Sequence, residues 1–186
     1  MLFEGGLGVV AAVVAVATGR PLLSLLNPSA VAALAGVAGA LVPLFVLDRL
    51  EDLGWAPLVR IRRELLRLLP PLLGNAGVAA TVAVAAAAGF GEELLFRGLV
   101  QTWTVEWCGP VAGVVLASMV FGLAHPISPA YVALAGAMGL WLGWIYHATG
   151  SLFAAAVAHG LYDYLAIRAL LGAAQTRDRV TDAETG

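Results

Sequence analysis

Long apolar stretches separated by short polar segments make up most of the chain. A helix needs about 20 apolar residues to cross a hydrocarbon core of about 30 Å. No segment shows the alternation of apolar and polar residues over about ten positions that a transmembrane β-strand requires. The pattern therefore predicts an all-α membrane bundle of about six transmembrane helices, at residues 5–19, 29–47, 72–90, 110–124, 128–146 and 150–171.

The polar segment at residues 48–70 has a different pattern. Its charged residues are Asp48, Arg49, Glu51, Asp52, Arg60, Arg62, Arg63, Glu64 and Arg67. From Ile61 to Leu69 the apolar positions recur at helical spacing, which predicts an amphipathic helix along the membrane interface. A solvated connecting helix is the alternative interpretation. We expect Pro70 and Pro71 to end this helix.

The distribution of arginine predicts the orientation of the chain. The four stretches after residue 71 return the chain to the side that it left, so the C-terminal arginines share a face with residues 48–70. Eight of the ten basic residues then lie on one side, which the positive-inside rule makes cytoplasmic. These eight are Arg49, Arg60, Arg62, Arg63, Arg67, Arg168, Arg177 and Arg179.

The same pattern divides the chain into three parts. Residues 1–70 hold two N-terminal transmembrane helices and the arginine-rich interfacial segment. Residues 71–171 form the helical core in which we expect the active site. Residues 172–186 are a polar tail, which we expect to be disordered from Gln175. Because Glu4 precedes the first apolar stretch and no arginine does, we interpret that stretch as a retained helix rather than a cleaved signal peptide.

The composition excludes several classes of protein. Hydrophobic residues make up 61% of the chain and charged residues only 12%, which is too apolar for a soluble domain. The net charge is −2 and no basic tract is present, so nucleic acid is not an expected partner. The single cysteine excludes an internal disulfide framework. Abundant Ala, Val, Gly and Arg without Lys suggest a bacterial chain, and therefore the inner membrane.

Few charges fall inside the apolar part of the chain. Between Pro71 and Ile167 the charged residues are Glu92, Glu93, Arg97, Glu106 and Asp163, and the same region holds His125, His147 and His159. Ionisable groups at membrane depth are costly and usually face the interior of the bundle. Helical spacing of four residues places Glu93 beside Arg97, Phe121 beside His125, and His159 beside Asp163.

The depths of these groups agree. If the chain turns at residues 108–110, Glu92 lies sixteen residues before Cys108 and His125 lies sixteen residues after Gly109. At a rise of 1.5 Å per residue, each is about 24 Å from the turn. A straight helix over residues 72–107 would be about 54 Å long, too long for one crossing, so we expect Gly89 and Gly91 to break or tilt it.

This combination of groups favours hydrolysis of a peptide bond within the membrane. A carboxylate beside a histidine can hold and deprotonate a water molecule. A second histidine with a carboxylate partner can donate a hydrogen bond to an oxyanion. No G-x-S-x-G or H-E-x-x-H motif is present. A metal site made by His125, His159 and either Glu92 or Asp163 stays open, because two histidines and a carboxylate are a common ligand set.

Three motifs resemble those of the CPBP intramembrane proteases, also called the Abi or CAAX prenyl protease type 2 family. They are Glu-Glu-x-x-x-Arg at 92–97, Phe-x-x-x-His at 121–125 and His-x-x-x-Asp at 159–163, within residues 72–170. The resemblance implies a glutamic-type intramembrane endopeptidase, in which Glu92 and His125 activate water. It also implies that His159 and Asp163 stabilise the oxyanion while Glu93 and Arg97 support the base. Asp163 departs from the Asn of the prenyl-protease branch.

The implied partners are the lipid bilayer and a membrane-embedded protein or peptide as substrate. No cofactor is favoured, and a divalent metal such as zinc is the alternative. A non-enzymatic membrane scaffold or immunity-type protein that retains the fold is the second functional hypothesis. A proton-coupled or metal-ion transporter is the third. It is disfavoured because the polar groups cluster in one layer rather than marking a path. The sequence predicts no particular oligomeric state.

Overall fold

The computed structural model describes residues 2–17 and 19–185, and every regular element within them is a helix. The all-α membrane bundle predicted from the apolar pattern is confirmed. The elements are α1 (Leu2–Ala17), α2 (Leu22–Leu26), α3 (Ala30–Asp52), α4 (Ala56–Leu73), α5 (Val78–Glu93), η1 (Leu94–Gln101), α6 (Thr102–Cys108), α7 (Pro110–Leu123), α8 (Pro129–Thr149) and α9 (Leu152–Thr185).

Each of the six predicted apolar stretches lies mainly in a helix. Three of the described helices are long and apolar enough to cross a membrane: Ala30–Asp52, Val78–Cys108 and Pro129–Thr149. Gly8–Ala17 and Pro110–Leu123 are shorter apolar helices. The sixth stretch is the first half of α9, which packs against α3, α5, α4 and α8.

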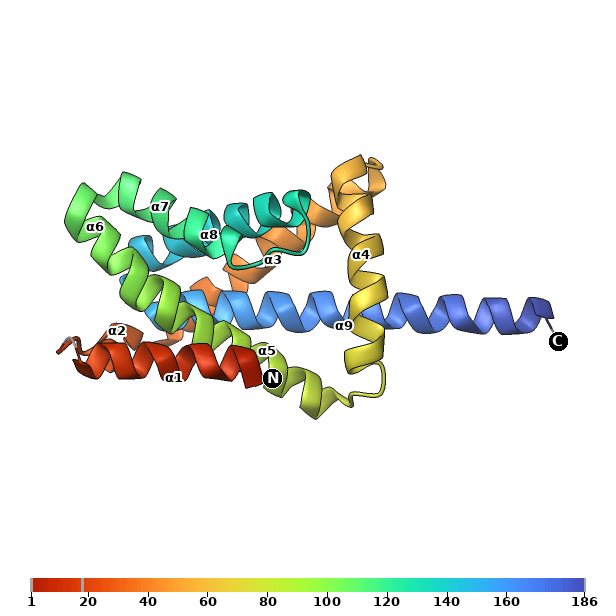
Figure 1. Ribbon diagram of the computed structural model, residues 1–186, viewed down its shortest axis with the longest axis horizontal. Helices are drawn as coiled ribbons and strands as arrows, with labels where there is room; N and C mark the ends of the chain where they lie inside the picture. The colour runs from red at the N-terminus through yellow and green to blue at the C-terminus, as the bar shows by residue number, and fades with distance from the viewer. Residues whose placement is uncertain (1, 18, 186) are drawn as a thin grey trace.

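Small residues bring the central helices close together. Ala154, Ala155, Ala156 and Ala158 of α9 are buried almost completely. A Cβ atom added to Gly36 of α3 would lie only 2.7 Å from Cβ of Val157 in α9. Close approach of backbones at small residues is the usual way in which membrane helices associate. Helix α9 is therefore the centre of the bundle, and its neighbours are held at short distance from it (Figure 1).

The long helix that carries the glutamates is not broken at Gly89 or Gly91, so the expected break is wrong, and the helix is instead inclined relative to α9. Elements α5, η1 and α6 form one continuous helix from Val78 to Cys108, which runs obliquely to α9 (Figure 1). An oblique helix crosses the same thickness with more residues. Gly89 serves close packing instead, since a Cβ atom added there would lie 2.6 Å from the backbone nitrogen of Gly160 in α9.

Helix α4 lies across one end of the bundle, where it crosses α9 (Figure 1). This orientation agrees with the predicted placement of α4 along the membrane interface, and that placement stays a prediction. The expected stop at Pro70 and Pro71 is wrong, since both prolines lie inside the helix, which ends at Leu73. Their fixed φ is helical, and the two hydrogen bonds that they cannot make belong to the last turns.

The polar tail is helical rather than disordered over its described residues. Helix α9 continues to Thr185 and extends beyond α4 (Figure 1), whereas Gly186 lies outside the described residues. Leu171 and Ala174 are still buried, so tertiary contacts continue past the end of the predicted apolar stretch. Propagation of a formed helix costs far less than its nucleation, which explains why α9 extends into polar sequence.

Candidate active site

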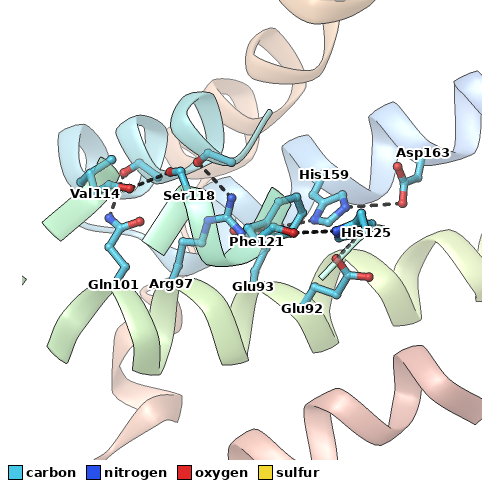
Figure 2. A network of polar contacts seen from close by, with 12 residues as sticks. Glu92, Glu93, Arg97, Gln101, Val114, Ser118, Phe121, His125, His159 and Asp163 are labelled. Carbon is cyan, nitrogen blue, oxygen red and sulfur yellow. Dashed lines mark hydrogen bonds and ion pairs between the residues drawn. The ribbon is translucent and has the colours of Figure 1, made fainter. Parts of the chain in front are cut away.

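The six residues predicted from the sequence lie together in the interior of the bundle (Figure 2). Three secondary-structure regions supply them: the α5–η1 helix, the loop after α7, and α9. The chain turns at Gly109 between α6 and α7, with a φ of +83° that favours glycine. This turn returns the chain so that His125 meets Glu92, as the matched depths predict.

Glu93 and Arg97 form an ion pair that is almost completely shielded from solvent. Their side chains are 0% and 2% exposed, and Arg97 Nη1 lies 3.0 Å from Glu93 Oε1. Arg97 Nη2 also donates a hydrogen bond of 3.0 Å to the carbonyl of Gly139 in α8. The guanidinium lies over the ring of Phe121, 4.4 Å from its centroid, which adds a cation–π contact. The predicted i,i+4 pair is thus confirmed, and it connects the α5–η1 helix to α7 and α8.

His159 lies between two carboxylates. Its Nδ1 is 2.9 Å from Glu93 Oε1, and its Nε2 is 3.5 Å from Asp163 Oδ2. Because a carboxylate can only accept, the short contact makes Nδ1 a donor to Glu93. The longer contact exceeds the usual hydrogen-bond length. The predicted pairing of His159 with Asp163 is confirmed. The contacts connect Glu93 and Arg97 to His159, whereas the family resemblance assigns them to the support of Glu92.

Glu92 faces His125 rather than the network of Glu93. His125 Nε2 lies 3.5 Å from Glu92 Oε2, while its Nδ1 lies 2.8 Å from the carbonyl of Phe121. A carbonyl accepts, so Nδ1 carries the hydrogen and the neutral ring presents Nε2 as an acceptor. Glu92 Oε2 is buried and has no hydrogen-bond partner among the described residues. Two hydrogen-bond acceptors, Glu92 Oε2 and His125 Nε2, therefore face each other. Either a proton lies between them or a third group donates a hydrogen bond to both.

Phe121 separates the two halves of the site. Its ring centroid is 4.6 Å from that of His125 and 5.8 Å from that of His159. It is also buried against Phe96, with a centroid distance of 4.9 Å in an edge-to-face arrangement. The ring thus contacts both histidines and Arg97.

Gln101 was not predicted as part of this network. It is buried at 2% exposure, and its Nε2 donates a hydrogen bond of 3.0 Å to the carbonyl of Gly143 in α8. Gln101 lies four residues after Arg97, and Gly143 lies four residues after Gly139, so the two contacts repeat along both helices (Figure 2). The sequence did contain a signal for Gln101, because it continues the four-residue spacing of Glu93 and Arg97.

Two other ionisable residues of the apolar region lie away from the site. Glu106 forms a two-bond ion pair with Arg20, with oxygen–nitrogen distances of 3.0 and 2.5 Å. Its side chain is 57% exposed, which agrees with its expected position near the turn. His147 is exposed in the last turn of α8.

A cavity of about 360 Å³ reaches the site from the α4 side of the bundle. Asp163, Tyr131 and Tyr162 lie on its wall, together with apolar residues of α3, α4 and α9. A second cavity of about 570 Å³ lies between α3 and α8, and its lining is almost wholly apolar. The two cavities share Leu47 and Leu134, so an apolar surface leads toward Asp163.

The described residues do not form a ligand set for a metal ion. No group of three or more His, Cys, Asp and Glu side chains among them is arranged to hold one. His159 directs its two ring nitrogens toward Glu93 and Asp163, and His125 directs Nδ1 toward a carbonyl. The arrangement suits acid–base chemistry, with one buried carboxylate facing a histidine and a second histidine held by two carboxylates.

An all-α bundle with membrane-spanning helices and a buried cluster of carboxylates and histidines defines a polytopic membrane protein with an intramembrane polar site. The family model described as Type II CAAX prenyl endopeptidase Rce1-like matches residues 74–165, which include all six site residues. Through these residues the chain belongs to the CPBP family, a family of CAAX-type intramembrane proteases. Neither the search of curated proteins nor the search of solved structures found a match.

Proposed function

We propose that the protein is a glutamic-type intramembrane endopeptidase, in which Glu92 and His125 activate the attacking water. The observation that carries the proposal is the pair of facing acceptors, Glu92 Oε2 and His125 Nε2, 3.5 Å apart. A water molecule that donates one hydrogen to each acceptor satisfies both of them and directs its lone pair away from the pair. Its oxygen is then oriented toward a substrate carbonyl carbon.

The chemical steps follow from this arrangement. The water oxygen forms a bond to the carbonyl carbon while Glu92 takes its proton, and the carbonyl electrons move to the oxygen. The tetrahedral intermediate then expels the amine, which breaks the C–N bond, and Glu92 returns the proton to the leaving nitrogen. The products are a carboxylic acid and an amine, and Glu92 is regenerated.

His159 is the proposed donor to the oxyanion. With Nδ1–H held by Glu93, an Nε2–H directed toward the site can donate to the developing negative charge. Arg97 holds Glu93 in place through the buried ion pair, so both residues orient His159 rather than contact the substrate. Asp163 Oδ2 faces the same Nε2 and orients it until the oxyanion forms.

A membrane-embedded protein or peptide is the proposed substrate. The cavity bounded by Asp163 shares the lining residues Leu47 and Leu134 with the apolar cavity between α3 and α8. The neighbouring apolar cavity offers a surface for an apolar segment close to Asp163, which supports a membrane-embedded substrate. The glutamic-type mechanism needs no metal ion, and the donor arrangement around both histidines supports it.

The proposed location is the bacterial inner membrane, with the C-terminus and the segment 48–70 on the cytoplasmic side. The C-terminal end of α9 and helix α4 lie at the same end of the bundle, opposite the turn between α6 and α7 (Figure 1). This agrees with the distribution of arginine. The loop that carries His125 follows α7 at that same end, so the site lies nearer the cytoplasmic surface.

Cleavage of membrane peptides by purified protein in vesicles tests the mechanism. We expect the Glu92→Gln variant to lose at least about 10²-fold in turnover, the usual contribution of a general base. Glu106→Gln is the matched control, because it makes the same change on the same long helix away from the site. Elemental analysis and chelator treatment accompany the assay. Full turnover by Glu92→Gln, or stoichiometric zinc with chelator-sensitive cleavage, would overturn the glutamic-type mechanism.

A further inference from the structure

Helix α4 has an outer face made of unpaired arginines. Arg60, Arg63 and Arg67 recur at helical spacing on one side of the helix, and all three are exposed. None of them has an ion-pair partner within residues 2–17 and 19–185. Two nearby arginines differ, because Arg49 pairs with Asp48 and Asp52, and Arg62 pairs with Glu51. The acidic residues at the end of α3 are thus already engaged.

The inner face of the same helix forms a wall of the candidate site. Leu58 and Ile61 are buried, and with Leu65 and Leu69 they line the cavity that contains Asp163. A single helix therefore presents arginines outward and the wall of the site cavity inward. Any force that holds α4 against the bundle also sets the shape of this cavity.

A side-chain contact also joins α4 to the loop that carries His125. Ser128 Oγ donates a hydrogen bond of 2.7 Å to Glu64 Oε2. The same oxygen caps α8 by accepting from the backbone nitrogen of Tyr131, at 3.3 Å. Ser128 lies three residues after His125, so this hydrogen bond ties α4 to the loop beside Glu92.

We propose that Arg60, Arg63 and Arg67 bind the phosphate groups of anionic phospholipids, and that this binding holds α4 against the site cavity. The planar guanidinium matches phosphate with two parallel hydrogen bonds. Helix α4 lies across the end of the bundle (Figure 1), and the headgroup layer of a bilayer is the position predicted for such an amphipathic helix. The charge of the membrane surface then determines how firmly the cavity wall and the His125 loop are held.

Hydrogen–deuterium exchange of the full chain in vesicles tests this proposal without requiring cleavage. One vesicle contains phosphatidylcholine alone, and the other contains phosphatidylcholine and phosphatidylglycerol in a three-to-one ratio. We expect the anionic vesicle to slow exchange of the α4 amides by at least about fivefold, the contribution of one basic residue near an anionic surface. Equal exchange in both vesicles would overturn the proposal, whatever the outcome of the protease assay.

Matched variants separate this face from general charge effects. Arg63→Gln/Arg67→Gln removes two charges from α4, and Arg177→Gln/Arg179→Gln removes two from the part of α9 that extends beyond it. We expect only the first variant to lose most of the response to anionic lipid. An equal loss of this response in both double variants would contradict specific lipid binding by α4. Inorganic phosphate added to the phosphatidylcholine vesicles is the second control, and the same protection with phosphate contradicts a lipid ligand.

Glu64→Ala tests the connection to the site. We expect this variant to keep the lipid-dependent protection of α4 but to lose it over residues 125–132, because the hydrogen bond from Ser128 is gone. Glu64→Gln keeps an acceptor oxygen and should retain at least part of the coupling. Lipid-dependent protection of residues 125–132 that is unchanged in Glu64→Ala would show that α4 does not transmit its position to the His125 loop.

Discussion

Two ion pairs in this protein join the same kinds of group in opposite surroundings. Arg97 and Glu93 are 2% and 0% exposed, whereas Arg20 and Glu106 are 27% and 57% exposed. The exposed pair has the closer geometry, with a nitrogen–oxygen distance of 2.5 Å against 3.0 Å. The nitrogen–oxygen distance of an ion pair is therefore a poor guide to its contribution to stability. Removing one partner of the buried pair leaves a charge that no water can solvate, while the partners of the exposed pair return to solvent.

The largest effect is expected for Arg97→Met. It leaves Glu93 buried without its cation and removes the hydrogen bond to Gly139, at a cost of about 3–5 kcal/mol in the free energy of unfolding. Denaturation in detergent, followed by circular dichroism, measures the loss. The double variant Glu93→Gln/Arg97→Met should recover part of it, because no uncompensated charge remains. A loss below about 1 kcal/mol would mean that the buried pair behaves like an exposed one.

A smaller loss is expected for Gly89→Ala, which tests whether the buried network depends on close helix packing. The added Cβ atom meets Gly160, and overpacking of this kind costs about 1–3 kcal/mol. The shift should also weaken the contact between Glu93 and His159, which the same denaturation and a cleavage assay can follow together. Gly172→Ala is the matched control, since it is helical and a Cβ atom there meets nothing within 4 Å. Equal stability of the two variants would contradict the role of this contact.

Asp163→Asn is expected to act on turnover more than on stability. The Asp163 side chain is 26% exposed and lines the cavity. An amide of the same volume fits there, so we expect little change in stability. Replacing one hydrogen-bonding group of this kind changes a rate by about tenfold or less. Comparing turnover with the unfolding midpoint of the same preparation separates the two effects. A loss as large as that of Glu92→Gln would place Asp163 in the proton transfer itself.

The smallest effect is expected for Arg20→Gln. The ion pair with Glu106 is exposed and screened by salt, so its removal should leave both the unfolding midpoint and turnover unchanged within error. Glu106→Gln should behave in the same way. A clear loss of stability or turnover in either variant would mean that the exposed ion pair contributes to the structure of this turn.

Local spacing predicted much of the site, because each pair depends on one helix. Glu93 with Arg97 and His159 with Asp163 follow from the helical repeat, and the matched depths of Glu92 and His125 follow from one turn. The hydrogen bond that ties Arg97 to α8 could not be predicted in this way. It depends on how closely two helices approach, because its acceptor is the backbone carbonyl of Gly139, and at Gly143 the absence of a side chain leaves room for Gln101.

The errors in the fold prediction arise where tertiary structure was not considered. Pro70 and the polar tail were interpreted from local preference, and Gly89 from the helix length that one membrane crossing allows. In the structure, Gly89 accommodates α9, Pro70 lies in the last turns of a helix, and α9 continues into the tail from a buried segment. Tertiary contacts and helix propagation outweigh local preferences, which are about 1 kcal/mol for glycine and about 3 kcal/mol for proline in a helix interior.

Element η1 is a π-helix, and this winding has a consequence for how the polar groups line up. In an α-helix, a residue four positions along is rotated by about 40° from the first, so a row of such residues drifts around the axis. The hydrogen bonds of a π-helix span five residues, and this looser winding reduces the drift. Arg97 and Gln101 therefore both face α8, where each donates a hydrogen bond to a glycine carbonyl. Deleting one residue within 94–101 would restore tighter winding and rotate Gln101 away from Gly143, while leaving Glu92 and Glu93 where they are.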